Sequence, residues 1–154
     1  MTHSNDVDIT LPDTLDQTFL LGLVGHSARL AFSMIRPHFQ REMLAFDLRP
    51  SDFAVLSLIS ANPGLAPKQL AEAINVSPPN LAAVLARLEG RELVARERGA
   101  TDQRTQCLRL TATGEAHYAA AADVVSRLEA QATAMLDDTE RAELLRLLHK
   151  IAGK

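Results

Sequence analysis

Apolar residues in this 154-residue chain follow a helical period up to about residue 90, and the period then changes to that of strands. Residues 93–98 and 105–110 are typical of two short strands, and residues 99–103 between them are typical of a hairpin tip. After the hairpin the helical period returns. The pattern therefore predicts a mainly α-helical fold with one small β-hairpin.

Composition agrees with this fold class. Hydrophobic residues make up 47% of the chain and are mostly Ala and aliphatic residues, whereas aromatic residues make up 4%. No apolar run reaches the ~20 residues that span a bilayer, and the polar, acidic N-terminus lacks the basic region of a secretory signal. The single cysteine, Cys107, excludes an internal disulfide framework. We expect a cytoplasmic protein that does not bind a membrane.

Charge is distributed unevenly along the chain. The formal net charge is −3, which by itself argues against a nucleic-acid partner. Residues 67–111, however, hold seven Lys and Arg against five Asp and Glu, while the rest of the chain holds nine against fourteen. A modestly basic centre between acidic flanks is compatible with DNA binding without establishing it.

The first half of the chain predicts one long helix. Residues 1–12 carry little apolar periodicity and are expected to be flexible, and Pro12-Asp13 is typical of a helix start with Asp13 as N-cap. Helical periodicity then continues for about thirty residues, a length of roughly 45 Å. Pro37 lies inside this stretch, so we expect a kink or a short break near residues 33–37.

Three shorter helices precede the hairpin. Pro50 is typical of a first helical position, Ala66-Pro67 begins the next helix, and Ser77-Pro78 begins the third with Ser77 as its cap. Asn75 suits the left-handed conformation of the tight turn between the last two. Two short helices joined in this way predict a helix-turn-helix. The buried stripe of its second helix is expected to be Leu81, Val84, Leu85 and Leu88.

The other face of that second helix could lie in the major groove of DNA, which is about 12 Å wide. Asn can bond adenine, Arg can bond guanine or a phosphate, and a small residue such as Ala83 allows close approach and contact with a thymine methyl group. The alternative is an ordinary helical hairpin in a helical protein. The residues predicted to contact DNA from this helix are Ser77, Pro78, Pro79, Asn80, Ala83 and Arg87.

The hairpin favours the DNA-binding interpretation. It presents Arg96 and Arg98 before its tip and Arg104 after it, next to the expected recognition helix. A two-stranded extension is barely stable alone in water, so its position suggests a wing that grips the backbone or minor groove. The alternative is a solvated strand edge whose charges deter aggregation, which suffices for Glu97 and Arg109.

Several motifs resemble those of the MarR family of transcription regulators, most specifically the Asp102-x-Arg104 tip followed by Leu110-Thr111-x-x-Gly114. The resemblance runs from about residue 20 to the end of the chain. One departure is that the family often has Gly before the Leu-Val step, where this chain has Arg91-Glu92. The other resembling segments are residues 48–53, 69–72, 76–77, 88–89 and 93–96.

The resemblance implies a winged helix-turn-helix regulator, by default a repressor, that binds a palindromic operator in promoter DNA as a homodimer. It also implies that Arg104 enters the minor groove and that Asp102 orients a wing arginine. The expected lobe for DNA binding is residues 48–111, and the helical dimerisation region is residues 13–47 and 112–154. The predicted wing contacts are Arg96, Arg98, Asp102, Gln103 and Arg104.

The end of the chain supports a dimer on physical grounds. Thr111 is expected to cap a helix over about residues 112–134, and Asp137 with Glu140 caps the last one. The last helix presents apolar residues where little of its own domain remains to cover them, and two-fold pairing would bury them. The alternative is that this helix packs on its own subunit. The residues expected in the dimer interface are Leu144, Leu147, Leu148 and Ile151.

Proteins that resemble this chain commonly release DNA when an aromatic acid, a phenol or a related thioester binds. Arg29, Ser33 and Arg36 recur at helical spacing in the first helix, where Arg could pair with a carboxylate and Phe could stack on a ring. The alternative is that these are surface or interface charges. The candidate effector residues are His26, Arg29, Phe32, Ser33, Arg36 and Phe39.

Other functions have weaker support. Cys107 lies alone in an expected strand, so a redox-responsive regulator would need a low-pKa thiol there. The histidines are scattered and predict no metal site, which leaves a metal-responsive regulator without ligands. No phosphate loop, nucleophile elbow or close His/carboxylate motif indicates an enzyme, and no cofactor is expected. A helical protein-interaction module without DNA binding is the remaining alternative.

Overall fold

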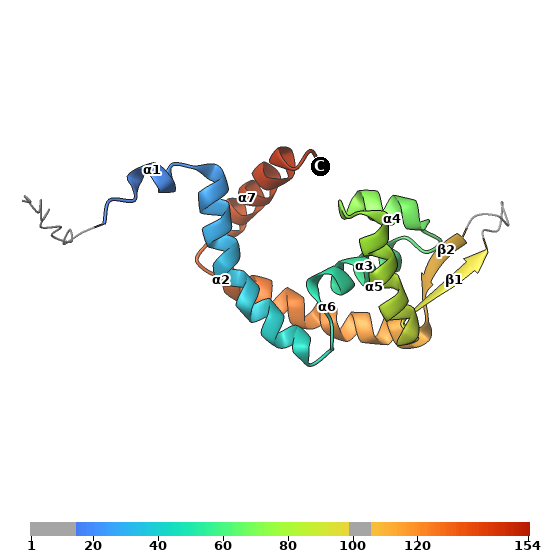
Figure 1. The fold of residues 1–154 in the computed structure, drawn as a ribbon. Coiled ribbons are helices and arrows are strands. Elements are labelled where there is room, and N and C mark those ends of the chain that lie inside the picture. The colour runs from blue at the N-terminus through green and yellow to red at the C-terminus, as the bar shows by residue number, and fades with distance from the viewer. Residues whose placement is uncertain (1–14, 99–105) are drawn as a thin grey trace, which may run out of the picture. The chain divides into compact units, whose positions relative to one another are not determined.

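The computed structural model describes residues 15–98 and 106–154, and these divide between residues 34 and 35 into two compact units. The mainly α-helical fold with one hairpin is confirmed (Figure 1). None of the described helices has the length and apolar character needed to cross a membrane. The elements are α1 (Thr18–Leu21), α2 (Val24–Leu44), α3 (Pro50–Ala61), α4 (Pro67–Ala73), α5 (Pro78–Gly90), β1 (Val94–Arg98), β2 (Gln106–Leu110), α6 (Ala112–Ala132) and α7 (Asp138–Ile151).

The first helical segment differs from the expected single helix. The expected cap Asp13 and the expected flexible residues 1–12 lie outside the described residues, but residues 15–17 are described and are not helical. Instead α1 begins at Thr18, whose backbone N–H donates to Asp16 Oδ1 at 2.9 Å. This hydrogen bond holds the pKa of the Asp16 carboxyl below its ordinary value.

The long helix is also interrupted where no interruption was expected. It stops at Leu21 and resumes at Val24; Gly22 lies in the gap and Gly25 is the second residue of α2. Each glycine costs about 1 kcal/mol relative to alanine inside a helix, which accounts for a break here. Conversely, α2 continues through Pro37, so the break considered near residues 33–37 is not formed.

The second unit has a continuous hydrophobic core centred on α3. Phe53 of α3 packs edge-on against Phe39 of α2, with ring centroids 5.8 Å apart, and its ring lies 5.7 Å from that of Tyr118 in α6. The Tyr118 hydroxyl donates to Ser57 Oγ at 3.1 Å. The buried hydrophobic residues of this core are Met43, Leu48, Val55, Leu56, Ile59, Leu70, Ala71, Leu81, Leu85, Leu88, Leu93, Val94, Leu108, Leu110 and Ala121.

Helices α4 and α5 form the predicted helix-turn-helix. Prolines occupy the first positions of α3, α4 and α5, as expected, and Asn75 in the turn has a left-handed backbone with φ of 53°. Ser77 is the N-cap residue of α5, as predicted, but its side chain makes no capping hydrogen bond. Pro78 and Pro79 take the next two positions and lack N–H groups, so part of the usual demand for a cap is absent.

The hairpin is antiparallel and is anchored at its base. Its register runs from Val94 opposite Leu110 to Arg98 opposite Gln106. Leu65, in the loop between α3 and α4, forms an additional bridge with Leu108, whose N–H donates to the Leu65 carbonyl at 2.9 Å. The bridge between Leu65 and Leu108 was not predicted from the sequence. It gives β2 a second neighbour, which a free two-stranded hairpin lacks.

The Leu-Thr-x-x-Gly segment joins the hairpin to α6 by close backbone contact. Thr111 caps α6 as predicted, because its Oγ1 accepts the Gly114 N–H at 2.9 Å, and it also donates to the Glu92 carbonyl at 2.5 Å. A Cβ atom on Gly114 would lie 1.9 Å from the Leu93 carbonyl oxygen. Only glycine fits this approach, which gives the motif a steric reason.

Helix α7 is well capped but buries none of its residues. Asp137 Oδ1 accepts the Glu140 N–H at 2.8 Å and Glu140 Oε2 accepts the Asp137 N–H at 2.9 Å, which is the predicted capping box. On its exposed surface the Arg146 guanidinium donates to both carboxylate oxygens of Glu143 at 2.7 Å. This pair lowers the pKa of Glu143 and raises that of Arg146.

Candidate nucleic-acid interface

Helix α5 divides into a buried face and a face of small exposed side chains. Leu81, Leu85 and Leu88 are buried and Val84 is half-buried, which confirms the predicted stripe. The exposed positions are Pro78, Pro79, Asn80, Ala82, Ala83, Ala86 and Gly90. The outer surface therefore presents little beyond the Asn80 amide and alanine methyl groups. A helix with such small side chains on its outer face could approach another surface closely.

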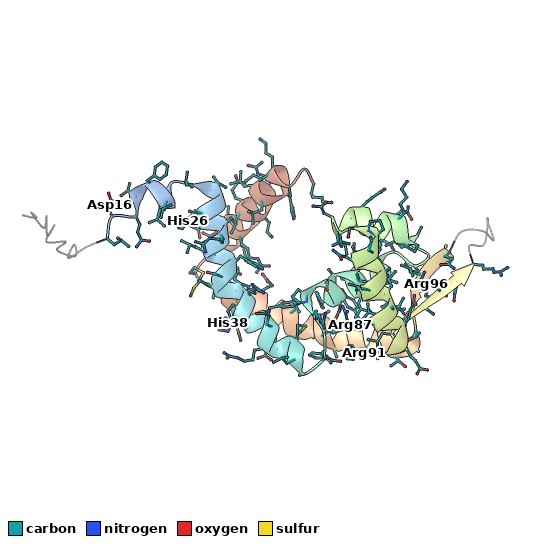
Figure 2. All side chains as sticks on the ribbon, in the orientation of Figure 1. Asp16, His26, His38, Arg87, Arg91 and Arg96 are labelled. Atoms are coloured by element: carbon teal, nitrogen blue, oxygen red, sulfur yellow. The ribbon has the colours of Figure 1, made fainter. Side chains whose placement is uncertain are left out.

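Arg87 does not have the position expected for a base-contacting residue. Its side chain is 30% exposed and the guanidinium turns toward α3, where Nη2 and Nε donate to the two carboxylate oxygens of Asp52 (Figure 2 labels Arg87). The Nε–Oδ2 distance is 3.3 Å. The helical spacing alone placed Arg87 on the outer face, but its long side chain reaches the buried carboxylate on α3.

Two further arginines tie the end of α5 to neighbouring segments (Figure 2). Arg91, just after the helix, donates to the carbonyl oxygens of Phe46 at 3.0 Å and Asp47 at 2.5 Å in the turn before α3. His117 of α6 lies with its Nε2 2.9 Å from the same Phe46 oxygen. The turn therefore joins α6 and the end of α5 through one carbonyl group.

Arg96 links the hairpin to α5. Its Nε donates to Glu89 of α5 at 2.5 Å, and its Nη1 donates to Gln106 of the opposite strand at 3.0 Å. Arg98, at the end of β1, is exposed. Arg109 pairs with Glu97 on the strands at 3.1 Å, as expected for a solvated strand edge. The other predicted wing contacts, Asp102, Gln103 and Arg104, lie outside the described residues.

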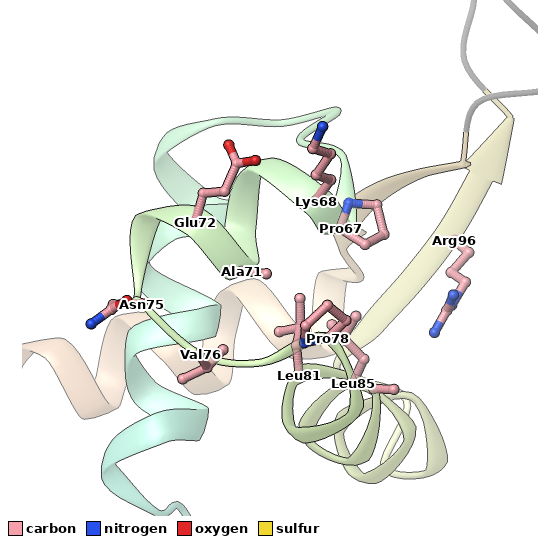
Figure 3. A pocket seen from close by; sticks show the side chains of 11 residues that line it. Pro67, Lys68, Ala71, Glu72, Asn75, Val76, Pro78, Leu81, Leu85 and Arg96 are labelled. Atoms are coloured by element: carbon pink, nitrogen blue, oxygen red, sulfur yellow. The ribbon is translucent and has the colours of Figure 1, made fainter.

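A pocket of about 520 Å³ opens between α4, α5 and β1 (Figure 3). Leu81 and Leu85 contribute apolar surface, whereas Lys68, Glu72 and Arg96 contribute charged groups. None of the predicted effector residues lines this pocket. A smaller pocket of about 140 Å³ is lined by His38 of α2 and by Leu128, Gln131 and Ala132 near the end of α6. Its volume is below that of typical small-molecule sites, which are roughly 300–1,000 Å³.

The predicted effector residues are divided between the two units. In the first unit Phe32 is exposed, the Ser33 hydroxyl donates to the Leu30 carbonyl at 2.7 Å, and Arg29 Nη2 lies 3.4 Å from His26 Nδ1. In the second unit Arg36 is exposed, whereas Phe39 packs on Phe53 at the edge of the core. Phe39 therefore already has an aromatic partner within its own unit.

The predicted dimerisation residues lie along one exposed helix. Leu144, Leu147, Leu148 and Ile151 are all exposed on α7, together with Leu145, which was not among the predicted contacts. Within residues 15–98 and 106–154 no element buries this apolar surface, and α7 contains no buried residue. Exposed leucines in such a row are typical of a surface that another chain covers.

Redox and metal chemistry gain no support from the described residues. Cys107 is half-buried in β2 and faces Glu97 in the strand register. No three His, Cys, Asp or Glu side chains within residues 15–98 and 106–154 gather in a way that could hold a metal ion.

Sequence reasoning did not single out Asp52, and it noted Glu92 only as part of a departure from the resembling family. Asp52 was included only in the resembling segment 48–53, although it precedes Val55, Leu56 and Ile59 by the spacing of their buried face. A charged residue at the spacing of a buried apolar face was the signal in the sequence that could have indicated a buried carboxylate. Glu92 has a left-handed backbone with φ of 56°, at the step where glycine is common in the resembling family. Glycine adopts this conformation without steric cost, which is a physical reason for glycine at this step.

Comparisons with known proteins agree with this geometry. A family model described as MarR family matches residues 48–105. Transcriptional regulator HosA of Escherichia coli is 32% identical over 126 residues, which cover 82% of this chain and 92% of that protein. A putative transcriptional regulatory protein for the hcr operon of Thauera aromatica is 33% identical over 102 residues, or 66% of this chain and 61% of that relative.

Among solved structures, the transcriptional repressor CouR bound to a 23-mer DNA duplex is 34% identical to this chain. The TM-score is 0.83, and the alignment covers 90% of this chain and 99% of that chain. CouR bound to p-coumaroyl-CoA aligns with a TM-score of 0.78, covering 90% of this chain and 98% of that one. The named relatives are transcription regulators rather than enzymes.

Proposed function

The chain belongs to the MarR family of transcription regulators, and on that basis we propose that it is a repressor that binds a palindromic operator as a homodimer. We further propose that a small aromatic acid, phenol or thioester releases it from DNA. The motif-based identification of the family is confirmed, and so is the winged helix-turn-helix fold. The operator symmetry, the dimer and the effector are the parts of the proposal that need experiments.

The observation that carries the DNA-binding proposal is the division of α5 into a buried leucine face and an exposed face of small residues. Asn80 is the one exposed side chain on this face with the amide that can bond adenine bidentately. Ala83 allows close approach to the major groove and offers a methyl group for contact with thymine. We infer that Asn80 and Ala83 contribute the base contacts of α5, with Ser77, Pro78 and Pro79 near the DNA backbone.

The wing supplies the second set of contacts in this proposal. Arg98 is exposed at the end of β1, and Asp102, Gln103 and Arg104 follow in the tip, which lies outside the described residues. The anchoring of β2 at Leu65 supports a wing that keeps its place beside α5. Arg96 is committed to Glu89 and Gln106, so we assign it to holding the wing rather than to DNA.

A homodimer accounts for the exposed leucines of α7. Pairing about a two-fold axis would bury Leu144, Leu147, Leu148 and Ile151 against their own copies. The same symmetry would present two α5 helices to DNA, and half-sites of such dimers are about 34 Å or one helical turn apart. We therefore propose residues 48–111 as the lobe that binds DNA and residues 13–47 and 112–154 as the dimerisation region.

The effector class is supported by one relative and by the sequence of α2. CouR, at 34% identity, has been solved with p-coumaroyl-CoA. In this chain Arg29, Ser33 and Arg36 recur at helical spacing along α2, and Arg can pair with a carboxylate or phosphate. Phe32 is exposed and available to stack on a ring, whereas Phe39 is held by Phe53. We propose that Arg29, Phe32, Ser33 and Arg36, with His26 nearby, contact the effector.

Binding to duplexes from the promoter region of the protein's own gene tests the DNA-binding proposal. Fluorescence anisotropy should show one duplex bound at least 1,000-fold more tightly than a scrambled duplex, with affinity falling steeply as salt rises. Arg104→Ala should weaken specific binding strongly, whereas Arg127→Ala, an equal charge change at an exposed position of α6, should not. If no duplex binds and Arg104→Ala changes nothing, the chain is not a regulator of this kind.

Release of the bound duplex tests the effector proposal. The titration compares p-coumaroyl-CoA, p-coumaric acid, salicylate and free coenzyme A against the same complex. We expect an aromatic acid or its thioester to release DNA and Arg29→Gln to raise the concentration required. Indifference to all the aromatic compounds, with release by peroxide or zinc, would instead assign sensing to Cys107 or the histidines.

A further inference from the structure

The buried carboxylate of Asp52 is the origin of a polar contact that reaches from α3 to α5. Its side chain is 1% exposed, and among the described residues Asp52 is the one charged or polar residue that is buried. Asp52 Oδ2 accepts the Arg49 N–H at 2.9 Å, and the Ser51 hydroxyl lies 3.4 Å from Oδ1. Arg87 then supplies the positive charge through Nε and Nη2.

This ion pair fixes the orientation of the Arg87 guanidinium as well as its distance from Asp52. A carboxylate that grips a guanidinium with two parallel hydrogen bonds fixes the plane and approach of the arginine. Leucine contacts, by comparison, are non-directional and tolerate small rotations of a helix. The Asp52–Arg87 pair is therefore the polar contact that specifies how α5 is rotated on α3.

The rotation of α5 bears directly on the proposed base contact. Asn80 and Arg87 are seven residues apart, so they lie two turns apart on nearly the same side of the helix. When Arg87 is held by Asp52, the direction of Asn80 is set as well. A contact to one base edge requires that direction to be right, because bidentate pairing depends on geometry.

We propose that Asp52 and Arg87 are positioning residues that orient α5 for sequence reading, and that Arg87 does not itself contact DNA. This inference rests on the proposed DNA-binding function. The competing possibility is that Arg87 leaves Asp52 and binds a base or phosphate. That exchange would leave a buried carboxylate without its positive partner, which is strongly unfavourable.

A double-mutant cycle separates the two possibilities. Arg87→Gln, Asp52→Asn and the double variant are measured against a duplex that the wild type binds specifically and against a scrambled duplex of the same composition. For positioning residues, each single variant should lower specific affinity about ten-fold or more, within the range that one good base contact provides. Affinity for the scrambled duplex should stay near that of the wild type, and the double variant should be no weaker than the weaker single variant.

The salt dependence and the Asp52→Asn result give the clearest contrast. A phosphate contact by Arg87 would make the slope of log affinity against log salt fall by about one in Arg87→Gln, whereas a positioning role leaves the slope unchanged. If Arg87 bound DNA, Asp52→Asn would free it and leave affinity equal or higher. Either of these results, or wild-type specificity in all three variants, overturns the proposal.

Arg87→Lys provides a variant in which folding is least disturbed, since the positive charge beside Asp52 is kept. Lysine presents a point charge rather than a planar fork. We expect Arg87→Lys to lose specific affinity while keeping its affinity for the scrambled duplex. Full retention of specific affinity would contradict the proposal. Arg127→Gln controls for the charge change in Arg87→Gln, and thermal unfolding confirms that each variant is folded.

Failure of the DNA-binding proposal itself has a different signature. In that case the wild-type protein shows no preference between any specific and scrambled duplex, before any variant is compared. When the wild type does discriminate, the cycle tests only the roles of Asp52 and Arg87.

Discussion

Helices α5 and α7 have the same kind of amphipathic pattern, but their apolar faces differ in burial. The chain itself buries the apolar face of α5, whereas that of α7 is exposed. The leucines of α5 are buried beneath α3 and the hairpin, and its polar residues Arg87 and Glu89 pair with neighbouring elements. The leucines of α7 are exposed, and its start is stabilised locally by the cap at Asp137. Periodicity shows which face of a helix is apolar, but what covers that face depends on the rest of the assembly.

Truncation of one leucine in each helix tests this difference most severely. Leu88→Ala should lower the free energy of unfolding by about 2–5 kcal/mol, because Leu88 is fully buried in its own chain. Leu147→Ala should change it by less than about 0.5 kcal/mol at dilutions where chains are separate. Thermal unfolding at several protein concentrations measures both.

At higher concentration the two leucine variants should also differ. A dimer is stabilised by mass action, so Leu147→Ala should reduce the concentration dependence of the unfolding temperature, whereas Leu88→Ala should not. Equal losses in the two variants at every concentration would mean that α7 packs on its own chain.

The junction between the hairpin and α6 offers a second test, of intermediate size. Gly114→Ala places a methyl group against the Leu93 carbonyl, and neither backbone can move away easily. We expect a loss of about 1–3 kcal/mol in stability, as for other overpacked sites. Gly90→Ala at the end of α5 is the control, since no atom beyond its chain neighbours and the backbone of its own helix lies within 4 Å of the added carbon. A Gly114→Ala protein as stable as Gly90→Ala would show that the close approach is not required.

The ends of the two helices give the smallest effect. After α7 the left-handed position is filled by Gly153, with φ of 69°, whereas after α5 it is filled by Glu92. Glu92→Gly should therefore raise the free energy of unfolding by up to about 1 kcal/mol, because glycine adopts this conformation without strain. Asn75→Gly should gain less, since asparagine tolerates the left-handed region. Chemical denaturation compares the two, and a loss of stability in Glu92→Gly would refute the strain at that position.

Local patterns predicted the helix starts at Pro50, Pro67 and Pro78, the caps Thr111 and Asp137, and the hairpin. These features depend on a few neighbouring residues, so they can be predicted from the sequence alone. The Asp52–Arg87 pair and the Leu65–Leu108 bridge join residues far apart in the chain, and their formation depends on how the elements pack. The break at Gly22 was missed because apolar periodicity continues across it, although two glycines lie within one turn.

The candidate interface was predictable to a similar extent. The exposed small residues of α5 follow from helical geometry, and Asn80 was singled out correctly as an exposed polar residue. Arg87 and Arg96 were expected to face DNA because the sequence shows only their positions along the helix or strand and not the partners of their side chains. Their side chains are long enough to reach the acidic residues Asp52 and Glu89, and spacing alone does not reveal such partners.

Selection of binding sites from a pool of random duplexes tests the central claim most directly, since it examines α5 and the chain pairing together. The wild-type protein should enrich an inverted repeat whose half-sites are centred one turn of DNA apart, about 34 Å, or a whole multiple of it. A protein in which α7 pairs two chains and α5 reads each half-site has no other symmetric outcome. Enrichment of a single unsymmetrical site, or of no sequence at all, would contradict the account.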